Sequence, residues 1–380
     1  MEDKQVKILY FVDRMMKAGI QTLVVDIVRK INKKKFKIDF LLLDDGNTYK
    51  LEEELMNLGC TIYKLKGIWV KTGIDFIKYV KAVDNFFKEH NDYQVVHMHS
   101  SSKNYIILKK AKKYGIKRRI AHSHNIDFQT RNIFKKIIGN LFKIKLIKYA
   151  TDYYACSKIA GSWLFGNKLV KDGKVKVIPN AIDYDKFKFN LNMRNKIRKE
   201  LGIKDNEILV GHIGRFVNQK NHVFLIKIFQ ELYKYNSNYK LLLIGNGPKE
   251  NKIIKKIRLL NLENNVLVLG FKNNVQDYMN AMDLFVFPSK FEGLGLVLVE
   301  AQANGLQCYA SKEVIPLEAK VSRQLTFIDL NNNNYKLWAK NIIQKFNYTR
   351  TDVKNEIAEN KYLIENTVEL LEKEYLKDNI

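Results

Sequence analysis

Short apolar runs alternate with longer stretches of helical spacing along most of the chain, and this alternation constrains the fold most strongly. Strands separated by helices run parallel, because the crossover helix returns the chain to the same end of the sheet. The pattern predicts two successive doubly wound parallel sheets. The expected strands are residues 6–12, 38–43, 61–65, 95–97, 119–122, 153–155 and 175–178, then 208–213, 239–244, 266–269, 284–287, 308–310 and 325–328.

The two series of strands divide the chain into two domains. A chain of 380 residues is too long for one ordinary core. Between the series lies Ile178–Phe187, in which a Pro-Asn turn suits a hinge. We expect residues 1–182 to form the first domain and residues 183–350 the second. Residues 351–380 are expected to form a C-terminal helix that packs back on the first domain.

Composition excludes membrane-spanning and disulfide-rich classes. The chain is 46% hydrophobic, with no apolar run long enough to span a bilayer and no signal peptide at its charged N-terminus. These features predict a cytoplasmic protein. Cys60, Cys156 and Cys308 are far apart and lie beside strand-like sequence, so we expect them to be reduced core residues.

The formal charge of +26 is unevenly spread, since residues 1–190 hold 38 Lys and Arg against 19 Asp and Glu. A basic face favours nucleic acid, anionic lipid or an anionic substrate, although a lysine-rich composition can produce the same excess. Zinc pairs and Gly-rich nucleic-acid loops are absent from the sequence, so we expect no nucleic acid. Residues 131–149 interleave lysines with apolar residues, which predicts either a helix at an anionic membrane surface or an ordinary core helix.

The stretch Ala281–Ala310 predicts a strand, a glycine-containing loop and a helix. A helix N-terminus attracts phosphate, and Gly293 and Gly295 allow close approach to the backbone. Glu292 lies in the loop, whereas Glu300 lies in an apolar helix, where a carboxylate needs a partner such as sugar hydroxyls. The alternative is an acidic first turn and one solvent-facing glutamate.

Two further loops follow strands of the second series. Arg215 and Lys220 project from the first, at the edge where such sheets bind ligands, and can neutralise a diphosphate without metal. The alternative is a solvated surface pair. The second loop, residues 245–248 (GNGP), lacks the Lys and Ser or Thr of a P-loop and is a weak signal by itself.

Histidines close two strands of the first series. His97 and His99, like His122 and His124, are two residues apart and so lie on one side of a strand, as metal ligands can. No cysteine or carboxylate in the nearby sequence completes a ligand set, so we expect hydrogen bonds to a substrate and no metal. Asp183 and Asp185 form a D-x-D string, which we assign to the hinge and not to a metal.

Several motifs together resemble the retaining glycosyltransferases of family 4. They are the pair Glu292 and Glu300, separated by seven residues within FEGLGLVLVEAQANG, and the strings HSHN, ACS, IPNAID, GRFVNQKN and GNGP. The likeness is to bacterial capsular and exopolysaccharide glycosyltransferases. It implies the GT-B fold, in which two Rossmann-like doubly wound domains face each other across a cleft.

The resemblance also implies roles for individual residues. In the second domain, Arg215 and Lys220 would bind the diphosphate, Glu300 the ribose, and Glu292 with Gly293, Leu294 and Gly295 the donor phosphate and sugar, while Gly214, Gly245, Phe271 and Lys272 would line the nucleotide site. In the first domain, His124, with His122 as the alternative, would contact the transferred sugar beside Asn125 and Gly19. The glycine pair of the family appears here as Ala18–Gly19, which leaves the role of the first glycine open. The catalytic residues would be Glu292, His124, Arg215 and Lys220.

The implied reaction is transfer of a sugar from a nucleoside diphosphate, expected to be UDP, with retention of anomeric configuration. The acceptor would be a glycan or polyprenyl-diphosphate-linked precursor, and no metal or cofactor beyond the nucleotide sugar is expected. Binding of the basic half to lipid would make the protein peripheral on the inner face of the membrane. A UDP-sugar epimerase of related architecture is the first alternative, and a non-catalytic basic nucleic-acid-binding protein the second.

Overall fold

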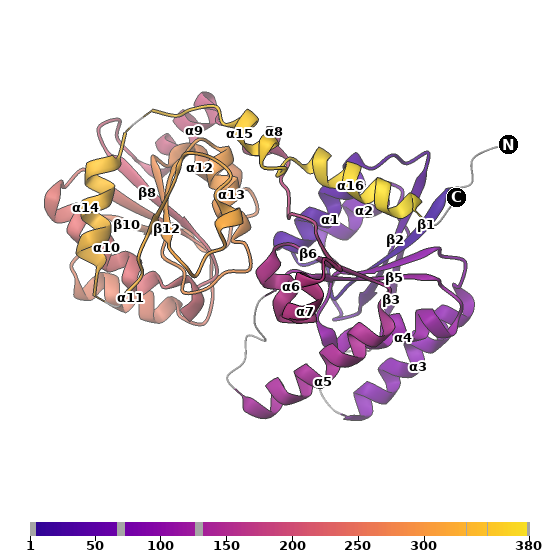
Figure 1. The fold of residues 1–380 in the computed structure, drawn as a ribbon. Coiled ribbons are helices and arrows are strands. Elements are labelled where there is room, and N and C mark those ends of the chain that lie inside the picture. Colours follow the sequence, from indigo (N-terminus) through magenta and orange to yellow (C-terminus); the bar gives the residue numbers. More distant parts are fainter. Residues whose placement is uncertain (1–4, 67–72, 126–131, 332, 348, 378–380) are drawn as a thin grey trace. The chain divides into compact units, whose positions relative to one another are not determined.

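The computed structural model describes residues 5–66, 73–125, 132–331, 333–347 and 349–377. The chain forms two compact units: Met1–Ala181 together with Ile364–Ile380, and Ile182–Leu363. Each unit contains a parallel sheet with helices around it (Figure 1). In the described part of the chain, no helix has the length and apolar character needed to cross a membrane.

The first unit contains a seven-stranded sheet in the order β3-β2-β1-β4-β5-β6-β7. Its strands are β1 (Val6–Val12), β2 (Phe36–Leu43), β3 (Ile62–Leu65), β4 (Val95–Met98), β5 (Arg118–Ser123), β6 (Asp152–Ala155) and β7 (Val175–Val177). Its helices are α1 (Gly19–Lys30), α2 (Lys50–Asn57), α3 (Gly73–Glu89), η1 (Ser102–Asn104), α4 (Tyr105–Lys113), α5 (Ile133–Tyr149), α6 (Lys158–Phe165), α7 (Asn167–Lys171) and α16 (Ile364–Leu376).

Strand β1 shows why this sheet requires helices on both faces. Ile8 and Tyr10 belong to one hydrophobic cluster, and Leu9 and Phe11 belong to another. Successive side chains of a strand point to opposite faces, so an uninterrupted apolar strand must be buried on both. The terminal helix α16 completes one of these two cores, because its Leu371 packs in the cluster that contains Ile8.

The second unit contains a six-stranded sheet in the order β10-β9-β8-β11-β12-β13. Its strands are β8 (Ile208–Ile213), β9 (Tyr239–Ile244), β10 (Val266–Val268), β11 (Leu284–Phe287), β12 (Gln307–Ser311) and β13 (Leu325–Ile328). Its helices are α8 (Tyr184–Phe187), α9 (Leu191–Leu201), η2 (Asn218–Lys220), α10 (His222–Tyr235), α11 (Glu250–Leu259), α12 (Val275–Ala281), α13 (Leu296–Ala303), η3 (Leu317–Ala319), α14 (Tyr335–Lys345) and α15 (Lys354–Glu359).

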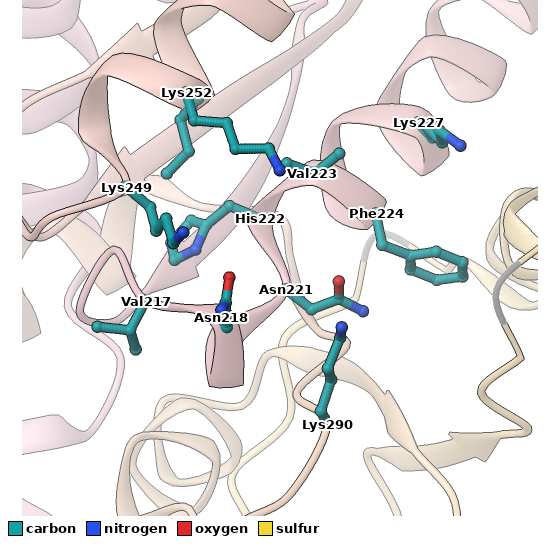
Figure 2. Close-up of a pocket in the computed structure, with 11 residues that line it drawn as sticks. Val217, Asn218, Asn221, His222, Val223, Phe224, Lys227, Lys249, Lys252 and Lys290 are labelled. Carbon is teal, nitrogen blue, oxygen red and sulfur yellow. The ribbon is translucent and has the colours of Figure 1, made fainter. Parts of the chain in front are cut away.

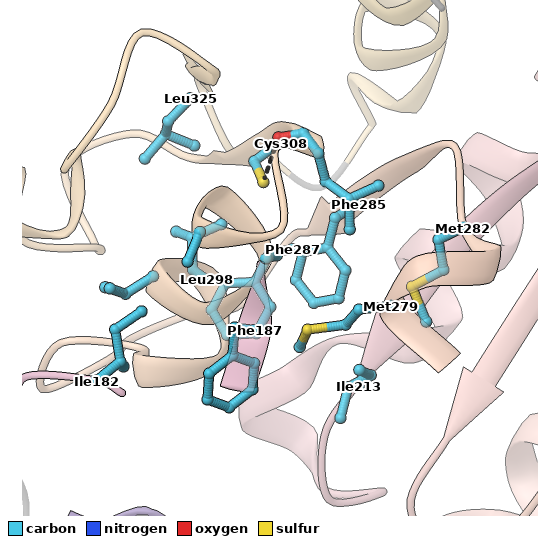
Figure 3. Packing of buried hydrophobic residues seen from close by; sticks show 14 of the residues in the cluster. Ile182, Phe187, Ile213, Met279, Met282, Phe285, Phe287, Leu298, Cys308 and Leu325 are labelled. Atoms are coloured by element: carbon cyan, nitrogen blue, oxygen red, sulfur yellow. Dashed lines mark hydrogen bonds between the residues drawn. The ribbon is translucent and has the colours of Figure 1, made fainter. Parts of the chain in front are cut away.

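A dense apolar core lies under the loop that joins β11 to α13. Figure 3 shows Phe285 and Phe287 of β11 packed with Leu298 of α13 and with the two methionines at the end of α12, Met279 and Met282. All five side chains are fully buried. The loop therefore begins and ends on elements that this core holds in place.

The strands expected from the sequence are all present, with ends that differ by at most two residues. The prediction of two doubly wound parallel sheets is confirmed. The three cysteines are free and buried, as expected. Helix α10 begins at His222, because residues 218–220 form a separate 3-10 turn and Asn221 has a left-handed backbone with φ of 56°.

Candidate functional site

The candidate site of the second unit lies where the strand order of its sheet reverses. Strands β8 and β11 are neighbours there, although each is connected through its crossover helix to a strand further outward. Loops after two such strands diverge and leave room for a ligand at their carboxyl ends. Residues 214–221 follow β8 and residues 288–295 follow β11, so the two sequence motifs meet at this edge.

The two loops carry an ion pair that the sequence motifs alone do not reveal. The ammonium of Lys220 lies 2.8 Å from a carboxylate oxygen of Glu292 and 4.5 Å from the ring centre of Phe287. The two charged side chains are only 15% and 7% exposed. A methyl group at Gly214 would lie 3.2 Å from the Lys220 side chain, so this glycine lets the lysine run close over the strand end.

Hydrogen bonds between the two loops fix their separation. The amide of Lys290 donates to the carbonyl oxygen of Gln219 at 2.8 Å. The side chain of Gln219 donates in turn to the carbonyl oxygen of Phe291 at 2.9 Å. These bonds position Lys220 and Glu292, which are the next residues along each loop.

Arg215 leaves the same loop toward solvent. Its side chain is exposed, whereas the following residue, Phe216, is fully buried and anchors the loop. In the described part of the chain, the Arg215 guanidinium has no ion-pair or hydrogen-bond partner. An exposed guanidinium can donate two parallel hydrogen bonds to a phosphate.

The GNGP loop contacts the Arg215 loop through backbone atoms. A methyl group at Gly245 would lie 2.1 Å from the carbonyl oxygen of Gly214, and the Gly245 φ of +141° is one that other residues rarely adopt. The Gly245 amide donates to the carbonyl oxygen of Gly270 at 2.8 Å. The next two residues after Gly270 are therefore held near this loop. They are Phe271, which is 53% exposed, and Lys272, whose ammonium lies 5.8 Å from the ring centre of Tyr278.

Helix α13 begins at the glycine-containing loop. Gly295 caps it in a left-handed conformation with φ of +80°, and Leu294 is buried beneath it. Glu300 lies on this helix and is half-buried. Gly305 follows the end of α13 in a left-handed conformation, with φ of +73°, and a methyl group there would lie 2.5 Å from the carbonyl oxygen of Thr351.

The candidate residues of the first unit lie at the reversal point of the other sheet, at the ends of β1, β4 and β5. Gly19 is the exposed first residue of α1. Because β4 and β5 are neighbours, the two histidine pairs meet. Within each pair, His97 with His99 and His122 with His124, the ring centres are 4.1 Å apart.

The four imidazoles form two hydrogen-bonded layers. In one layer, His99 Nδ1 lies 3.0 Å from His124 Nε2, and His124 Nδ1 lies 3.0 Å from the side-chain oxygen of Asn180. With this oxygen as the acceptor, the proton of neutral His124 is on Nδ1 and His99 donates to Nε2. Both nitrogens of His124 are therefore engaged within the chain, and a sugar contact through either nitrogen would replace one of these bonds.

The second layer connects the histidines to the terminal helix. His97 Nε2 lies 3.1 Å from His122 Nδ1, and His97 Nδ1 lies 2.7 Å from the hydroxyl of Tyr375 on α16. That hydroxyl lies 2.7 Å from the hydroxyl of Tyr10 on β1. The Nε2 atom of His122 is buried and has no hydrogen-bond partner among the described residues.

The environment keeps these imidazoles neutral. Burial lowers the pKa of His97, His99 and His122 well below the usual 6.5, and it lowers the pKa of His124 to about 4. Neutral imidazoles can hold a transition metal, and one nitrogen each from His97, His99 and His122 lies within 4.8 Å of the others. A metal held by one nitrogen of His97 would replace the hydrogen bond of that nitrogen, either to Tyr375 or to His122.

The sequence motifs located these positions but not their contacts. Glu292 is 6% exposed and paired, whereas the sequence placed it simply in a loop. Asn125 follows the strand that carries His122, and it is half-buried. Tyr375 was missed altogether, because nothing in the sequence of a terminal helix signals contact with a histidine at position 97. The two-residue spacing within each histidine pair was the one sequence feature that indicated a histidine cluster.

Two family models match the chain. "Glycosyl transferases group 1" matches residues 193–360, and "Glycosyltransferase Family 4" matches residues 18–186. EpsF of Bacillus subtilis, named as a glycosyltransferase, is 33% identical over 316 residues, which cover 83% of this chain and 81% of EpsF. The capsular polysaccharide biosynthesis glycosyltransferase CapH of Staphylococcus aureus is 26% identical, with 78% of each chain covered.

A further relative and a solved structure extend these similarities. The Escherichia coli enzyme UDP-Gal:alpha-D-GlcNAc-diphosphoundecaprenol alpha-1,3-galactosyltransferase is 28% identical, with 63% of each chain covered. The crystal structure of Anabaena HepE in complex with UDP and glucose superposes with a TM-score of 0.79 at 18% identity, covering 98% of this chain and all of HepE. At this identity the superposition shows the fold, which is GT-B.

Proposed function

Because this chain belongs to the glycosyltransferases of family 4, we propose that it transfers a sugar from UDP to a lipid-linked precursor of a cell-surface polysaccharide, with retention of anomeric configuration. Support for the donor comes from the E. coli relative, whose name specifies UDP-Gal, and from HepE, which binds UDP. Support for the acceptor comes from the diphosphoundecaprenol carrier in the same relative's name.

The ion pair of Lys220 and Glu292, with exposed Arg215 on the same sheet edge, carries the donor part of this proposal. Arg215 and Lys220 bind the two phosphates of UDP, and the first amides of α13 add donors at a helix N-terminus. Glu300 accepts hydrogen bonds from the ribose hydroxyls, and Phe271 with Lys272 lies against the base. Glu292 orients Lys220 and contacts the donor sugar.

The proposed chemistry needs no covalent enzyme intermediate. The acceptor hydroxyl oxygen bonds to the anomeric carbon on the face from which UDP leaves. The bond from that carbon to the phosphate oxygen breaks, its electron pair stays on UDP, and that oxygen takes the hydroxyl proton. Arg215 and Lys220 stabilise the charge that grows on UDP. His124, with His122 as the alternative, contacts the transferred sugar.

A helix of the first unit supports an acceptor at a membrane. Six large apolar residues of α5 are exposed, spaced so that they share one face; they are Ile133, Phe134, Ile137, Ile138, Leu141 and Ile144. The opposite face is anchored by buried Leu146. The interpretation of residues 131–149 as an ordinary core helix does not account for this exposure. Arg131 lies outside the described residues.

We infer that the exposed face of α5 docks on an anionic lipid surface. Exposed Lys145 and Lys148 lie at the C-terminal end of α5, and the first half of the chain carries the larger positive excess. Apolar side chains beside lysines suit insertion below charged headgroups. A lipid-linked acceptor would then be presented to the enzyme at the surface on which it rests.

The decisive experiment is mass spectrometry of products after incubation with a panel of nucleotide sugars and an undecaprenyl-diphosphate-linked acceptor. We expect one UDP-sugar to yield an acceptor heavier by one sugar, with the new linkage of the same anomeric configuration as the donor. Free epimerised UDP-sugar without acceptor extension would instead identify an epimerase. Extension from a GDP- or ADP-sugar alone would disprove the UDP assignment.

A further inference from the structure

A pocket opens in the second unit beside the donor edge, with a cavity volume of about 240 Å³. It lies between the start of α10, the loop before it and the start of α11 (Figure 2). Its lining residues are Val217, Asn218, Asn221, His222, Val223, Phe224, Lys227, Lys249, Lys252, Ile253 and Lys290. None of them belongs to the residues proposed above to hold the donor.

The lining is strongly basic, with four lysines and no carboxylate. Within the described residues, none of these four lysines has an ion-pair partner within 4.0 Å. The Lys227 ammonium lies 5.3 Å from the ring centre of Tyr335 on α14. Figure 2 shows Lys249 and Lys252 on one wall and Lys290 rising from the opposite side toward Asn221. Ammonium groups gathered in one pocket repel one another, and a bound anion removes that cost.

Hydrogen-bond donors without acceptors face the same region. Helix α10 begins at His222, and the amides of His222 and Val223 donate to no described residue. The His222 side chain is 3% exposed, and neither ring nitrogen has a hydrogen-bond partner in the described part of the chain. Burial and the nearby charge of Lys220 lower its pKa to about 4, so the neutral ring carries one unpaired N–H. Buried donors without acceptors are uncommon in folded proteins, and a bound anion in this pocket would supply the missing acceptor.

The pocket shares its two loops with the donor edge. Asn218 precedes Lys220 by two residues, and Lys290 precedes Glu292 by two. The bond from the Lys290 amide to the Gln219 carbonyl links these loops between the two sites. An anion held by Asn218 and Lys290 would therefore fix the loops that carry the donor-binding ion pair.

We propose that this pocket binds a small diphosphate anion at a site separate from the donor, and that its occupancy stabilises the loops of Lys220 and Glu292. Lys249, Lys252 and Lys290 supply positive charge for a diphosphate, and the first turn of a fourteen-residue helix supplies aligned amide donors. The site is assigned to a diphosphate in solution, and the donor's own diphosphate is assigned to Arg215 and Lys220.

Calorimetric titration with inorganic pyrophosphate at constant ionic strength tests this assignment. The full-length protein is first saturated with UDP, so that the donor edge is filled. We expect pyrophosphate still to bind at one site, and the double variant Lys249→Gln/Lys252→Gln to bind at least tenfold more weakly. The single variant Lys290→Gln, on the opposite wall, should weaken binding in the same direction.

A matched variant on the same helix provides the control. Lys255→Gln/Lys256→Gln removes equal charge from α11 at positions that do not line the pocket, and we expect it to bind pyrophosphate like the wild type. Equal loss in both double variants, or no binding to the UDP-saturated protein, would overturn the proposal. If UDP itself fails to bind, the donor proposal fails. The pyrophosphate affinities of the two double variants are then compared in the UDP-free protein, and equal loss in both would again overturn the proposal.

Discussion

Lys220 and Glu292 join two loops through one ion pair, at the place where we propose that the donor binds. Their side chains are largely removed from solvent and lie on loops that depend on each other for position. A buried ion pair contributes little net stability, but removal of one partner leaves an uncompensated charge. The Glu292 carboxylate thus holds the Lys220 side chain in place before a phosphate binds. This reduces the side-chain entropy that would be lost on binding in the proposed site.

Arg215→Ala and Lys220→Ala are each expected to weaken UDP binding by about 1.5–3 kcal/mol, the range for hydrogen bonds to charged groups. The two variants should differ in their free energy of unfolding. Lys220→Ala lowers the free energy of unfolding because Glu292 remains buried without its cation, whereas exposed Arg215 has no such partner. Calorimetry with UDP and urea denaturation measure the two effects. Unchanged UDP affinity in both variants would remove this pair from the site.

Metal chelation tests the charge balance at the same edge. EDTA is expected to leave turnover intact, because in the proposed site Arg215, Lys220 and the α13 amides would balance the diphosphate charge. Asp185, half of the only D-x-D string considered as a metal ligand, is instead exposed and lies 2.9 Å from the Lys188 ammonium. The measurement is activity before and after dialysis against EDTA. Loss of activity restored by manganese would show a metal requirement, and loss restored by zinc would point to the histidine cluster.

At the scale of elements, helix α5 carries an exposed apolar face that packing against the described residues does not explain. Replacement of Phe134, Ile137 and Leu141 by serine is expected to release the protein from vesicles that contain anionic lipid. Each of these side chains is more than half exposed, so the fold should persist, while each contributes up to about 1.5–3 kcal/mol when buried in lipid. Vesicle sedimentation at rising salt measures the release.

Two exposed leucines of the second unit give the matched control for that experiment. Leu259 and Leu317 are each 74% exposed, and their replacement by serine should leave vesicle binding unchanged. UDP affinity should be unchanged in both sets of variants. Failure of the wild-type protein to bind anionic vesicles at low salt would contradict the role assigned to α5.

The sequence predicts elements well and contacts between elements poorly. An apolar run such as residues 208–213 is bounded by charge and turns, so local pattern fixes the strand. The pairing of Lys220 with Glu292 depends on β8 and β11 being neighbours, which is a property of strand order and not of local sequence. The same holds for the His97 contact with Tyr375. For α5, the helix was predictable, but its exposed face depends on what the rest of the fold leaves uncovered.

At the scale of the whole molecule, buried histidines predict a dependence of stability on pH. Six of the seven histidines have a pKa below the usual 6.5, chiefly through burial: His97, His99, His122, His124, His212 and His222. Unfolding raises each pKa toward 6.5, so the unfolded chain binds more protons below that pH. The stability they contribute is present above pH 6.5 and is lost as pH falls toward the folded values.

Each such histidine contributes a slope of up to about 1.4 kcal/mol per pH unit in that interval. We therefore expect the urea midpoint to fall markedly between pH 7 and pH 5.5, an interval in which ordinary carboxylates do not titrate. Equal midpoints at these two pH values would show that the imidazoles are accessible to protons in the folded state.

Helix α16 makes the folding of the first unit depend on the order in which the chain is synthesised. The second unit is continuous, whereas the first needs both ends of the chain, with Leu371 in its core and Tyr375 against His97. A ribosome releases α16 after every element of the second unit, so residues 182–363 can fold while the first unit still lacks this helix. A chain truncated after residue 363 would keep the second unit whole, but its first unit would lack Leu371 in the core and the Tyr375 contact with His97.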